Sequence, residues 1–331
     1  MALTYAQSGV NIAAGESFVQ RIRKSARSTY SKAVLSDIGA FGGFYDARFK
    51  SYKAPVLVSS VDGVGTKVLI AQRMNIHHTM GQDLVNHCVN DILVCGARPL
   101  FFLDYFATGK LDLNIANDVI SGFVKACREN TCSLIGGETA EMPGLYKDGE
   151  YDLAGTIVGV VEKKDIIDGT CVEEGDILVG LPSSGLHTNG YSLARTVLLK
   201  EYDLNDYVDE LGDTVGNVLL AIHRSYLEIA TAVLKRFDVS ALAHITGGGI
   251  IANTMRVVPK EMELAIDWNA WKRPMIFQLI QRLGTVPEDD MRRTFNLGVG
   301  MVLIVPRKQA ADVVRFLLKR GEMGFVMGEV H

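Results

Sequence analysis

The sequence lacks the features that would place it in a membrane or among disulfide-rich proteins. No apolar run in its 331 residues approaches the roughly 20 residues that a membrane-spanning helix needs. The N-terminus has no basic-then-apolar secretory pattern. The five cysteines form no CxxC pair, which is typical of reduced thiols that pack as small hydrophobic side chains. We therefore expect a cytoplasmic protein without a membrane partner.

The chain also lacks an excess of positive charge. Its 34 Lys and Arg residues against 38 Asp and Glu residues give a formal net charge of -4, which offers no surplus for binding nucleic acid. Hydrophobic residues make up 48% of the chain and charged residues 22%, as in soluble globular proteins. The length is sufficient for two domains, each with its own core.

Strand-like and helical runs alternate through most of the sequence. They alternate from 54 to 161 and resume after the charged, turn-rich segment 163–176. This pattern predicts a mixed α/β (α+β) fold with two domains, residues 1–165 and 166–331. In the second half it predicts one helix over 215–236. Residues 37–46 contain three glycines, and two interpretations fit them: a surface loop, or a segment that closes over a ligand.

The stretch SSVDGVGTK, residues 59–67, has glycines and a lysine but not the spacing of a phosphate-binding loop. A predicted strand over 54–60 precedes it and a predicted helix over 66–74 follows, so Asp62 is expected at a strand end, opening a glycine turn. Backbone amides at a helix start favour anions such as phosphate, which the negative charge of Asp62 would repel. A divalent cation between Asp62 and the phosphate would remove this repulsion. The alternative is that Asp62 only caps the helix.

A predicted helix over 81–99 carries an unusual polar face. Long charged side chains are absent from this face, whose members are Asp83, Asn86, His87, Asn90 and Asp91. Short polar side chains suggest a face turned toward a ligand, where Asp91 would join Asp62 on a metal. An ordinary polar helix face is the alternative.

A third acid follows a predicted strand at 132–137. Glu138 comes directly after two glycines in LIGGETAEMPG, residues 134–144. Because Asp62, Asp91 and Glu138 all lie at or near element ends, one Mg²⁺–phosphate site can unite them. A cap or a salt bridge would explain any one of them alone. Asp104, at another predicted strand end, is a weaker candidate.

Two stretches of the second half are rich in glycine and hydroxyl side chains. PSSGLHTNGYSLAR (182–195) and AHITGGGIIANTMR (243–256) each pass through a turn into a predicted helix. Backbone amides and hydroxyls at such turns bind phosphate without needing lysine. His187 and His244 are candidate proton carriers or phosphate donors, although a lone histidine is more often structural.

Taken together, the sequence motifs resemble those of the AIR synthetase, or phosphoribosylformylglycinamidine cyclo-ligase, family. The resemblance runs from Tyr5 to Val330. It is carried by YAQSGVNIAAG, SSVDGVGTK, GQDLVNHCVNDILVCGARPLFFLDYFATGKLD, SLIGGETAEMPG, GVVEKKDIIDG, SSGLHTNGYSLAR, AHITGGGI and RTFNLGVGM.

The resemblance implies an activity and an assembly. ATP would activate the formamide oxygen of formylglycinamidine ribonucleotide, and the amidine nitrogen would then close the imidazole ring to give aminoimidazole ribonucleotide, ADP and phosphate. The family also implies a Mg²⁺ site and a two-domain fold whose N-terminal sheet joins its mate across a homodimer. Alternatives are a small-molecule kinase or selenophosphate synthetase type of the same superfamily, or a catalytically silent nucleotide-binding protein.

The resemblance further assigns residues to roles. ATP binding falls to Asp62, Gly63, Gly65, Thr66, Asn90, Gly136 and Gly137, and metal binding to Asp62, Asp91 and Glu138. Substrate binding falls to Ser183, Ser184, Gly185, Asn189, His244, Thr246, Gly247, Gly248 and Gly249. The catalytic set comprises His187 for proton transfer, Asp91, and Lys67 as a charge partner. Asn11 and Arg23 depart from the family's usual aspartate and lysine.

Overall fold

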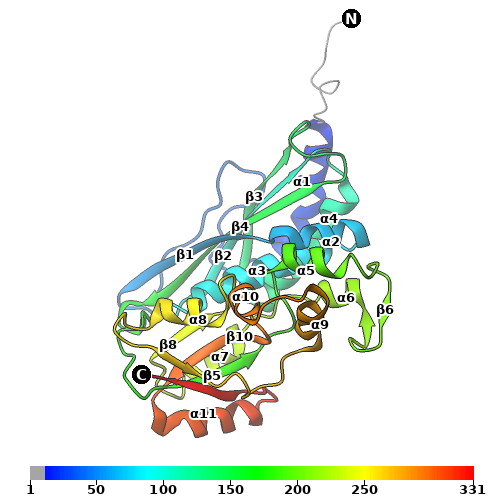
Figure 1. The fold of residues 1–331 in the computed structure, drawn as a ribbon. Coiled ribbons are helices and arrows are strands. Elements are labelled where there is room, and N and C mark those ends of the chain that lie inside the picture. The colour runs from blue at the N-terminus through cyan, green and yellow to red at the C-terminus, as the bar shows by residue number, and fades with distance from the viewer. Residues whose placement is uncertain (1–11) are drawn as a thin grey trace, which may run out of the picture. The chain divides into compact units, whose positions relative to one another are not determined.

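The computed structural model describes residues 12–331, which form two compact units (Figure 1). The first unit comprises the chain up to Ile92 together with Ala97–Lys164, and the second comprises Leu93–Gly96 together with Asp165–His331. Asn11 and the rest of the motif segment 5–11 lie outside the described residues. Within residues 12–331, none of the helices combines the length and the apolar character that a bilayer crossing requires.

A four-stranded sheet forms the centre of the first unit. Its order is β1 (Pro55–Gly63), β4 (Tyr151–Glu162), β2 (Arg98–Thr108) and β3 (Ser133–Glu141). β4 pairs antiparallel with both β1 and β2, whereas β3 lies at the edge and pairs parallel with β2.

Helices cover one face of this sheet. The helices of the unit are α1 (Ile12–Arg27), the short η2 (Gly65–Lys67), α2 (Val68–Met74), α3 (His78–Leu93) and α4 (Leu113–Glu129). α4 begins where the Asp112 carboxylate accepts hydrogen bonds from two backbone amides of its first turn. α3 and α4 pack closely at Gly81 and Gly122, where a β-carbon on Gly81 would come within 2.3 Å of a backbone oxygen of α4.

The alternation of side chains distinguishes the two faces of the sheet. Tyr151 and Leu153 of β4 are buried on the helix-covered face. On the other face Leu57, Val61 and Tyr105 keep 61%, 66% and 38% of their surface exposed. The first unit therefore presents apolar side chains on an open sheet face.

The second unit is built on a five-stranded antiparallel sheet. Its order is β8 (Ala241–His244), β10 (Val299–Val305), β5 (Ile177–Pro182), β11 (Phe325–Val330) and β9 (Leu264–Ile266). Its helices are α5 (Tyr191–Leu198), α6 (Val215–Leu219), α7 (Leu227–Leu234), α8 (Gly249–Thr254), α9 (Met275–Gly284), α10 (Glu288–Thr294) and α11 (Arg307–Lys319). The minor elements of the chain are η3 (Lys163–Asp165), η4 (Met255–Val257) and the β6–β7 pair (Tyr207–Val208 and Asp213–Thr214).

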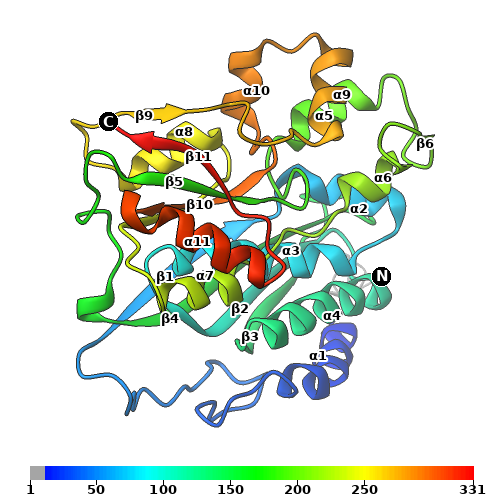
Figure 2. The same ribbon diagram turned by 90° about the horizontal axis from the view of Figure 1, so that it is seen from below.

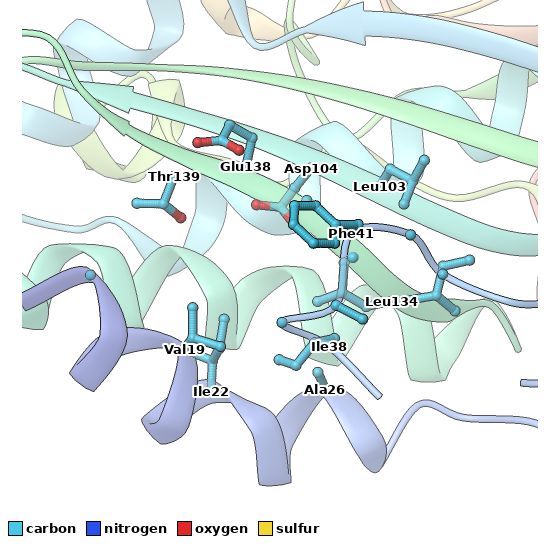
Figure 3. Close-up of a pocket in the computed structure, with 18 residues that line it drawn as sticks. Val19, Ile22, Ala26, Ile38, Phe41, Leu103, Asp104, Leu134, Glu138 and Thr139 are labelled. Atoms are coloured by element: carbon cyan, nitrogen blue, oxygen red, sulfur yellow. The ribbon is translucent and has the colours of Figure 1, made fainter. Parts of the chain in front are cut away.

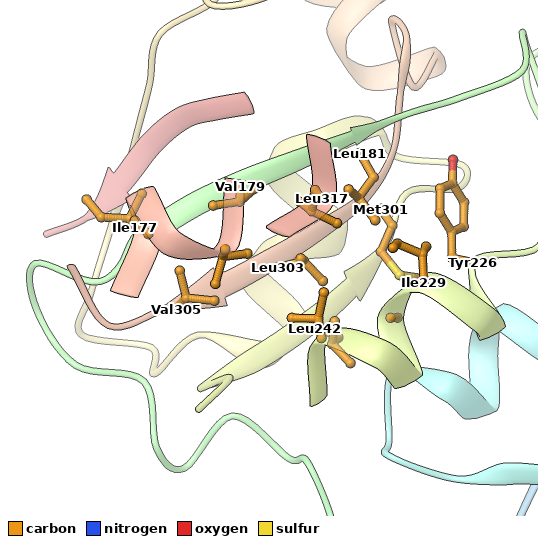
Figure 4. Packing of buried hydrophobic residues seen from close by; sticks show 14 of the residues in the cluster. Ile177, Val179, Leu181, Tyr226, Ile229, Leu242, Met301, Leu303, Val305 and Leu317 are labelled. Carbon is orange, nitrogen blue, oxygen red and sulfur yellow. The ribbon is translucent and has the colours of Figure 1, made fainter. Parts of the chain in front are cut away.

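Both faces of the second sheet are buried, which explains the unbroken apolar run of β10. Leu303 and Val305 pack into a cluster with α7 and α11 (Figure 4). Val302 and Ile304 pack on the other side of the sheet with α8. Figure 2 shows α7 and α11 on one side of this sheet.

The predicted helix over 215–236 is wrong in one respect, because the structure interrupts it at residues 220–226 between α6 and α7. No proline or glycine causes this break. Tertiary hydrogen bonds hold the intervening segment instead: the Tyr226 hydroxyl donates to the Pro182 carbonyl at 2.8 Å, and the Ser184 hydroxyl donates to the Ile222 carbonyl at 2.5 Å.

Candidate functional site

Two of the predicted acids of the first unit meet at one histidine. His87 Nε2, on α3, lies 2.7 Å from Asp62 Oδ2 on β1 and 3.7 Å from Asp91 Oδ2 one helical turn further along α3. The Ser60 hydroxyl donates to Asp91 Oδ2 at 3.0 Å. The helix and the strand thus bring together two carboxylates that are 29 positions apart in the sequence.

The pair of acids is partly open, whereas the histidine is not. The side chains of Asp62 and Asp91 are 41% and 24% exposed, against 5% for His87. Burial alone would lower the pKa of His87, but the hydrogen bond with Asp62 and the charge of Asp91 together raise it. Accessible carboxylate oxygens of this kind are the ligands that Mg²⁺ prefers, so the residues present fit such an ion.

The helix-cap interpretation of Asp62 does not fit the structure. β1 extends through Asp62, whose Oδ1 accepts a hydrogen bond from the Gly63 amide at 2.7 Å. The N-cap of the following η2 is Val64, without a side-chain cap. Gly65 has a φ of 58°, which suits glycine. Thr66 is half-buried beside it.

The third predicted acid, Glu138, is not brought to the same place. The register aligns Asp62 with Gly155, and Gly155 with Asp104, across β1, β4 and β2. With about 4.8 Å between strands, Asp104 lies about 10 Å from Asp62 along this row. Glu138 lies opposite Tyr105, so its side chain belongs to the open face of the sheet. The structure thus separates Glu138 from the acid pair on His87.

Glu138 instead lines a pocket at the β3 edge of the sheet (Figure 3). The pocket has a volume of about 540 Å³, and α1 contributes apolar side chains to it, including Val19 and Ile22. Residues 38–43 form another wall. Residues 39–44 are exposed, so the segment 37–46 is a surface loop, and this loop also borders the cavity.

Asp104 is the second acid of this pocket. Burial is the main cause that raises the pKa of Asp104 to about 7, and the charge of Glu138 also raises this pKa. A hydrogen bond with its own backbone amide lowers it. A β-carbon on Gly137, its partner on β3, would lie 2.2 Å from Asp104 Oδ1. Glycine at 137 therefore makes room for the carboxylate. The sequence predicted Asp104 at a strand end, whereas the structure places it inside β2, paired on both sides. The acid within the apolar run FFLDYF was the available signal.

This pairing also corrects a predicted element boundary. The strand predicted over 132–137 was expected to end before Glu138, but β3 continues to Glu141. Both glycines are strand residues, and Gly137 allows the close approach of β2, since a β-carbon there would lie 2.6 Å from the Asp104 carbonyl oxygen.

Lys67 does not reach solvent. Its Nζ lies 2.8 Å from Asp83 Oδ2, and both side chains are fully buried. Burial lowers the pKa of Lys67, while the charge of Asp83 opposes that shift. The structure therefore gives Lys67 an internal ion pair, where the sequence predicted a charge partner for phosphate. Asn90, predicted to bind ATP, is also fully buried.

In the second unit, the two predicted substrate segments lie at one edge of the sheet. β5 and β8 each pair antiparallel with β10, so their carboxyl ends point the same way and lie on either side of the start of β10. The loops 183–190 and 245–248 follow these ends. They are adjacent, because a β-carbon on Gly247 would lie 3.1 Å from Asn189 Oδ1.

Two asparagines that the sequence analysis missed hold these loops. Asn253 Nδ2 donates to the carbonyls of Gly249 at 2.8 Å and Gly247 at 3.2 Å. Asn296 Oδ1 accepts from the Ser183 hydroxyl at 3.1 Å. Asn296 belongs to the motif RTFNLGVGM, which was the available signal.

The remaining predicted residues also lie in these loops. The Ser183 hydroxyl donates to the Gly185 carbonyl at 2.9 Å, and the Thr246 hydroxyl to Asn253 Oδ1 at 3.2 Å. Gly248 has a φ of +98°. Gly249 has a φ of +74°, and a β-carbon there would lie 1.8 Å from the Arg292 carbonyl oxygen. Gly249 is therefore required by both its conformation and its surroundings.

His187 and His244 meet through a third histidine that the sequence analysis did not single out. The rings of His187 and His223 stack with centroids 4.0 Å apart, and His223 Nε2 lies 3.0 Å from His244 Nε2. The Ser184 amide donates to His187 Nε2 at 3.2 Å. All three histidines are buried. His223 had no sequence signal, because it lies inside what the pattern predicted as a continuous helix.

Comparison with known protein families and curated relatives gives full-length matches. Residues 47–161 match the family model "AIR synthase related protein, N-terminal domain", and residues 173–331 match the corresponding C-terminal domain. Phosphoribosylformylglycinamidine cyclo-ligase from Caldanaerobacter subterraneus subsp. tengcongensis is 49% identical over 330 residues, covering 99% of this chain and 97% of that protein. The enzyme of the same name from Sorangium cellulosum is 50% identical over 334 residues, covering 100% of this chain and 96% of that protein.

Solved structures share the fold at low sequence identity. Thiamine-monophosphate kinase from Stenotrophomonas maltophilia K279a aligns with a TM-score of 0.70 at 15% identity, covering 94% of this chain and 92% of its own. The hydrogenase maturation protein HypE in complex with ATP aligns with a TM-score of 0.68 at 17% identity, covering 98% of this chain and 87% of its own. At this level of identity, the likeness establishes the architecture alone.

Proposed function

The chain belongs to the phosphoribosylformylglycinamidine cyclo-ligase family, and on this premise we propose how its residues divide the work of ring closure. The reaction is a ligation that forms a C–N bond, closing the imidazole ring of 5-aminoimidazole ribonucleotide in purine biosynthesis. An amide oxygen is a poor leaving group, and transfer of a phosphoryl group from ATP converts it to phosphate. Such a transfer needs positioning and charge stabilisation more than covalent chemistry from the protein.

The observation that carries the proposal is the pair of accessible carboxylates on His87. Asp62 and Asp91 would hold Mg²⁺. When bound, the ion would supply positive charge that neutralises the ATP phosphates and orients them. His87 would hold both acids in place from the buried side, because its Nε2 atom lies 2.7 Å from Asp62 and 3.7 Å from Asp91.

We assign the nucleotide to the pocket at the β3 edge. Its apolar wall from α1 suits a purine ring, and Gly136 and Gly137 leave the strand backbone accessible beside it. Glu138 and Asp104 would face the nucleotide in this pocket. The sheet register keeps these two acids apart from Asp62 and Asp91. The fold relative HypE, whose structure contains ATP, supports nucleotide binding by this architecture.

The substrate is assigned to the glycine-rich loops of the second unit. Backbone amides of Ser183 to Asn189 and of Gly247 to Gly249 would hold the ribose phosphate of formylglycinamidine ribonucleotide. His187 would take the proton released at the closing nitrogen, because it is the histidine within the first loop. His244 would support it from the end of β8.

We further propose a homodimer that acts in the cytoplasm. The exposed apolar face of the first unit's sheet, with Leu57, Val61 and Tyr105, is the kind of surface that a second copy covers.

Substitution of Asp91 tests the metal assignment. Asp91→Asn keeps the shape of the side chain and an oxygen that accepts from Ser60, so the protein should fold normally. We expect phosphate release that depends on formylglycinamidine ribonucleotide to fall at least about 100-fold, the order of effect expected when an electrostatic group is removed from a transition state. Formation of the aminoimidazole, read by diazo coupling, should fall in parallel.

The matched control is Asp148→Asn, which removes one exposed carboxylate from a loop of the same unit. This variant should keep wild-type activity. Activity of Asp91→Asn within about threefold of wild type would remove Asp91 from the site, whereas ATP turnover without aminoimidazole would indicate a different phosphoryl acceptor.

A further inference from the structure

We propose that His187, His223 and His244 form a binding site for a transition-metal ion of the Zn²⁺ class in the second unit. One nitrogen of each ring lies within 4.8 Å of the others. All three side chains are buried, with 1%, 0% and 6% of their residue surface exposed. Three histidines with a fourth position for water are a common Zn²⁺ ligand set.

His223 and His244 already have the separation that a shared ion requires. Tetrahedral Zn²⁺ with Zn–N bonds of 2.0–2.1 Å places its ligand nitrogens about 3.3–3.4 Å apart. The two Nε2 atoms are 3.0 Å apart. At this distance one Nε2 atom donates its proton to the other. When an ion binds both Nε2 lone pairs, that proton moves to the Nδ1 atom of the same ring.

The surroundings of His223 orient its ring for this role. Its Nδ1 lies 3.3 Å from the Thr188 hydroxyl, which can accept the Nδ1 proton and leave the lone pair on Nε2. Metal-binding histidines are held in the same way, by a hydrogen bond at the nitrogen that does not bind the ion.

His187 would complete the site by a small movement. Its ring lies on His223 at an interplanar angle of 20°, and metal ions bind in the plane of an imidazole, so the ring must turn out of the stack. The backbone of β10 lies close to the ring of His187, since a β-carbon added at Gly300 would be 2.5 Å from its Cε1 atom. The ring therefore has little room to turn toward β10. A nitrogen within 4.8 Å has to approach by about 1.5 Å or less to reach tetrahedral spacing.

The chemistry of the cluster selects the class of ion. Imidazole nitrogens suit Zn²⁺, Co²⁺, Ni²⁺ and Cu²⁺, whereas Mg²⁺ prefers oxygen. The three ligands come from three segments, namely the loop after β5, residues 220–226 and the end of β8. A bound ion would therefore link these segments and stabilise the folded chain by mass action.

Co²⁺ binding to the full-length protein tests the proposal directly. The protein is stripped with a chelator and titrated with Co²⁺ in excess Mg²⁺, which occupies oxygen-rich sites. Visible absorption bands report a tetrahedral nitrogen site. We expect one Co²⁺ per chain with these bands, and at least a 100-fold loss of affinity in His223→Gln. The control His78→Gln, which changes a half-exposed histidine of the first unit, should leave binding unchanged.

Absence of stoichiometric Co²⁺ binding to the wild type, or unchanged binding in a folded His223→Gln variant, would overturn the proposal. If circular dichroism shows that His223→Gln is unfolded, X-ray absorption of the Zn²⁺-loaded wild type decides instead. Scattering from three imidazoles supports the site, and fewer imidazoles overturn it. An ion bound to His187 takes up a lone pair that could accept a proton, so the metal-bound form and the ring-closing form are alternative states of this side chain. These readouts are independent of ring-closing activity, so failure of the metal site is distinguishable from failure of the catalytic assignment of His187.

Discussion

Individual acids of the first unit differ in character because their neighbours differ. Asp62 and Asp91 face a histidine whose pKa they raise, and they stay partly open to solvent. Asp104 is held against the backbone of Gly137, and burial brings its pKa to about 7. Asp83 is fully buried with Lys67. Residue type alone therefore does not distinguish the accessible acids beside His87 from the acid of the pocket, or either of these from the acid of the buried ion pair.

Removing one member of the Lys67–Asp83 ion pair should destabilise the fold much more than replacing both members with apolar side chains. Lys67→Met leaves a buried carboxylate without its cation, and we expect a loss of about 3–5 kcal/mol in the free energy of unfolding. The double variant Lys67→Met/Asp83→Leu removes both charges and should recover most of that loss. Urea unfolding followed by circular dichroism measures both.

The single variant Asp83→Leu completes the cycle. It leaves the ammonium group of Lys67 without this partner and should be as damaging as Lys67→Met. Losses that simply add in the double variant would show that the two side chains do not act as a pair.

At the scale of elements, the sequence predicts strands and helices well where one periodicity dominates. The pattern over 151–162 coincides with β4, and the pattern over 113–129 coincides with α4. It fails where tertiary contacts override local preference. In the segment 220–226 the Tyr226 hydroxyl bonds to the Pro182 carbonyl, and β3 continues through two glycines because it pairs with β2 as far as Glu141.

The same limit applies to the candidate site. Helical spacing and a strand end are enough to predict that Asp91 and Asp62 lie close together, as they do at His87. The sequence pattern cannot predict the partners of Glu138. These depend on the register between β2 and β3, which decides the face of the sheet on which the side chain lies. A shift of one residue in a strand exchanges the two faces.

Helices α9 and α10 are joined by one carboxylate whose contribution depends on pH. Glu288 accepts hydrogen bonds from Arg273 at 2.7 Å and 3.0 Å, from Gln281 at 2.9 Å and from Arg292 at 2.9 Å. The bonds with Arg273 are the main cause that lowers the pKa of Glu288 to about 2. A lowered carboxyl pKa stabilises the fold above the unfolded value, about 4.3, and this stabilisation is lost as pH falls toward 2.

Glu288→Gln should therefore be less stable than wild type at pH 7, and the difference should disappear by about pH 2. We expect about 1 kcal/mol or less, since the side chain is 37% exposed and solvent screens its charge. Denaturant unfolding across this pH range measures the effect. Glu261→Gln, which changes an exposed carboxylate on the same unit, should show little dependence. A Glu288→Gln difference that grows as pH falls would contradict the assignment.

For the whole molecule, alternating patterns and the turn-rich segment at 163–176 were enough to predict two mixed units. The core of the second unit follows from its sequence, since a run of apolar residues such as β10 requires cover on both faces. The sheet of the first unit differs, because Leu57 and Val61 lie on a face of β1 that remains exposed. Apolar side chains at these positions are expected where another chain covers the sheet.

Charge placed on this face should weaken self-association. We expect the wild-type protein to sediment with twice its chain mass of 36.1 kDa. Val61→Lys places an ammonium group in the centre of the proposed interface, where burying an unpaired charge is costly. The dissociation constant of the dimer should rise at least 10-fold, or about 1.4 kcal/mol. Sedimentation equilibrium over a range of protein concentrations measures it.

The control for this prediction is Leu318→Lys. Leu318 is 55% exposed on α11 of the second unit, so this variant adds the same charge at a similarly exposed apolar residue. If both variants stay as dimeric as wild type, or if both dissociate equally, the open sheet face is not the interface. If only Val61→Lys dissociates, the face carrying Leu57, Val61 and Tyr105 joins the two copies. Loss of ring-closing activity in that monomer would then show that the site depends on the second copy.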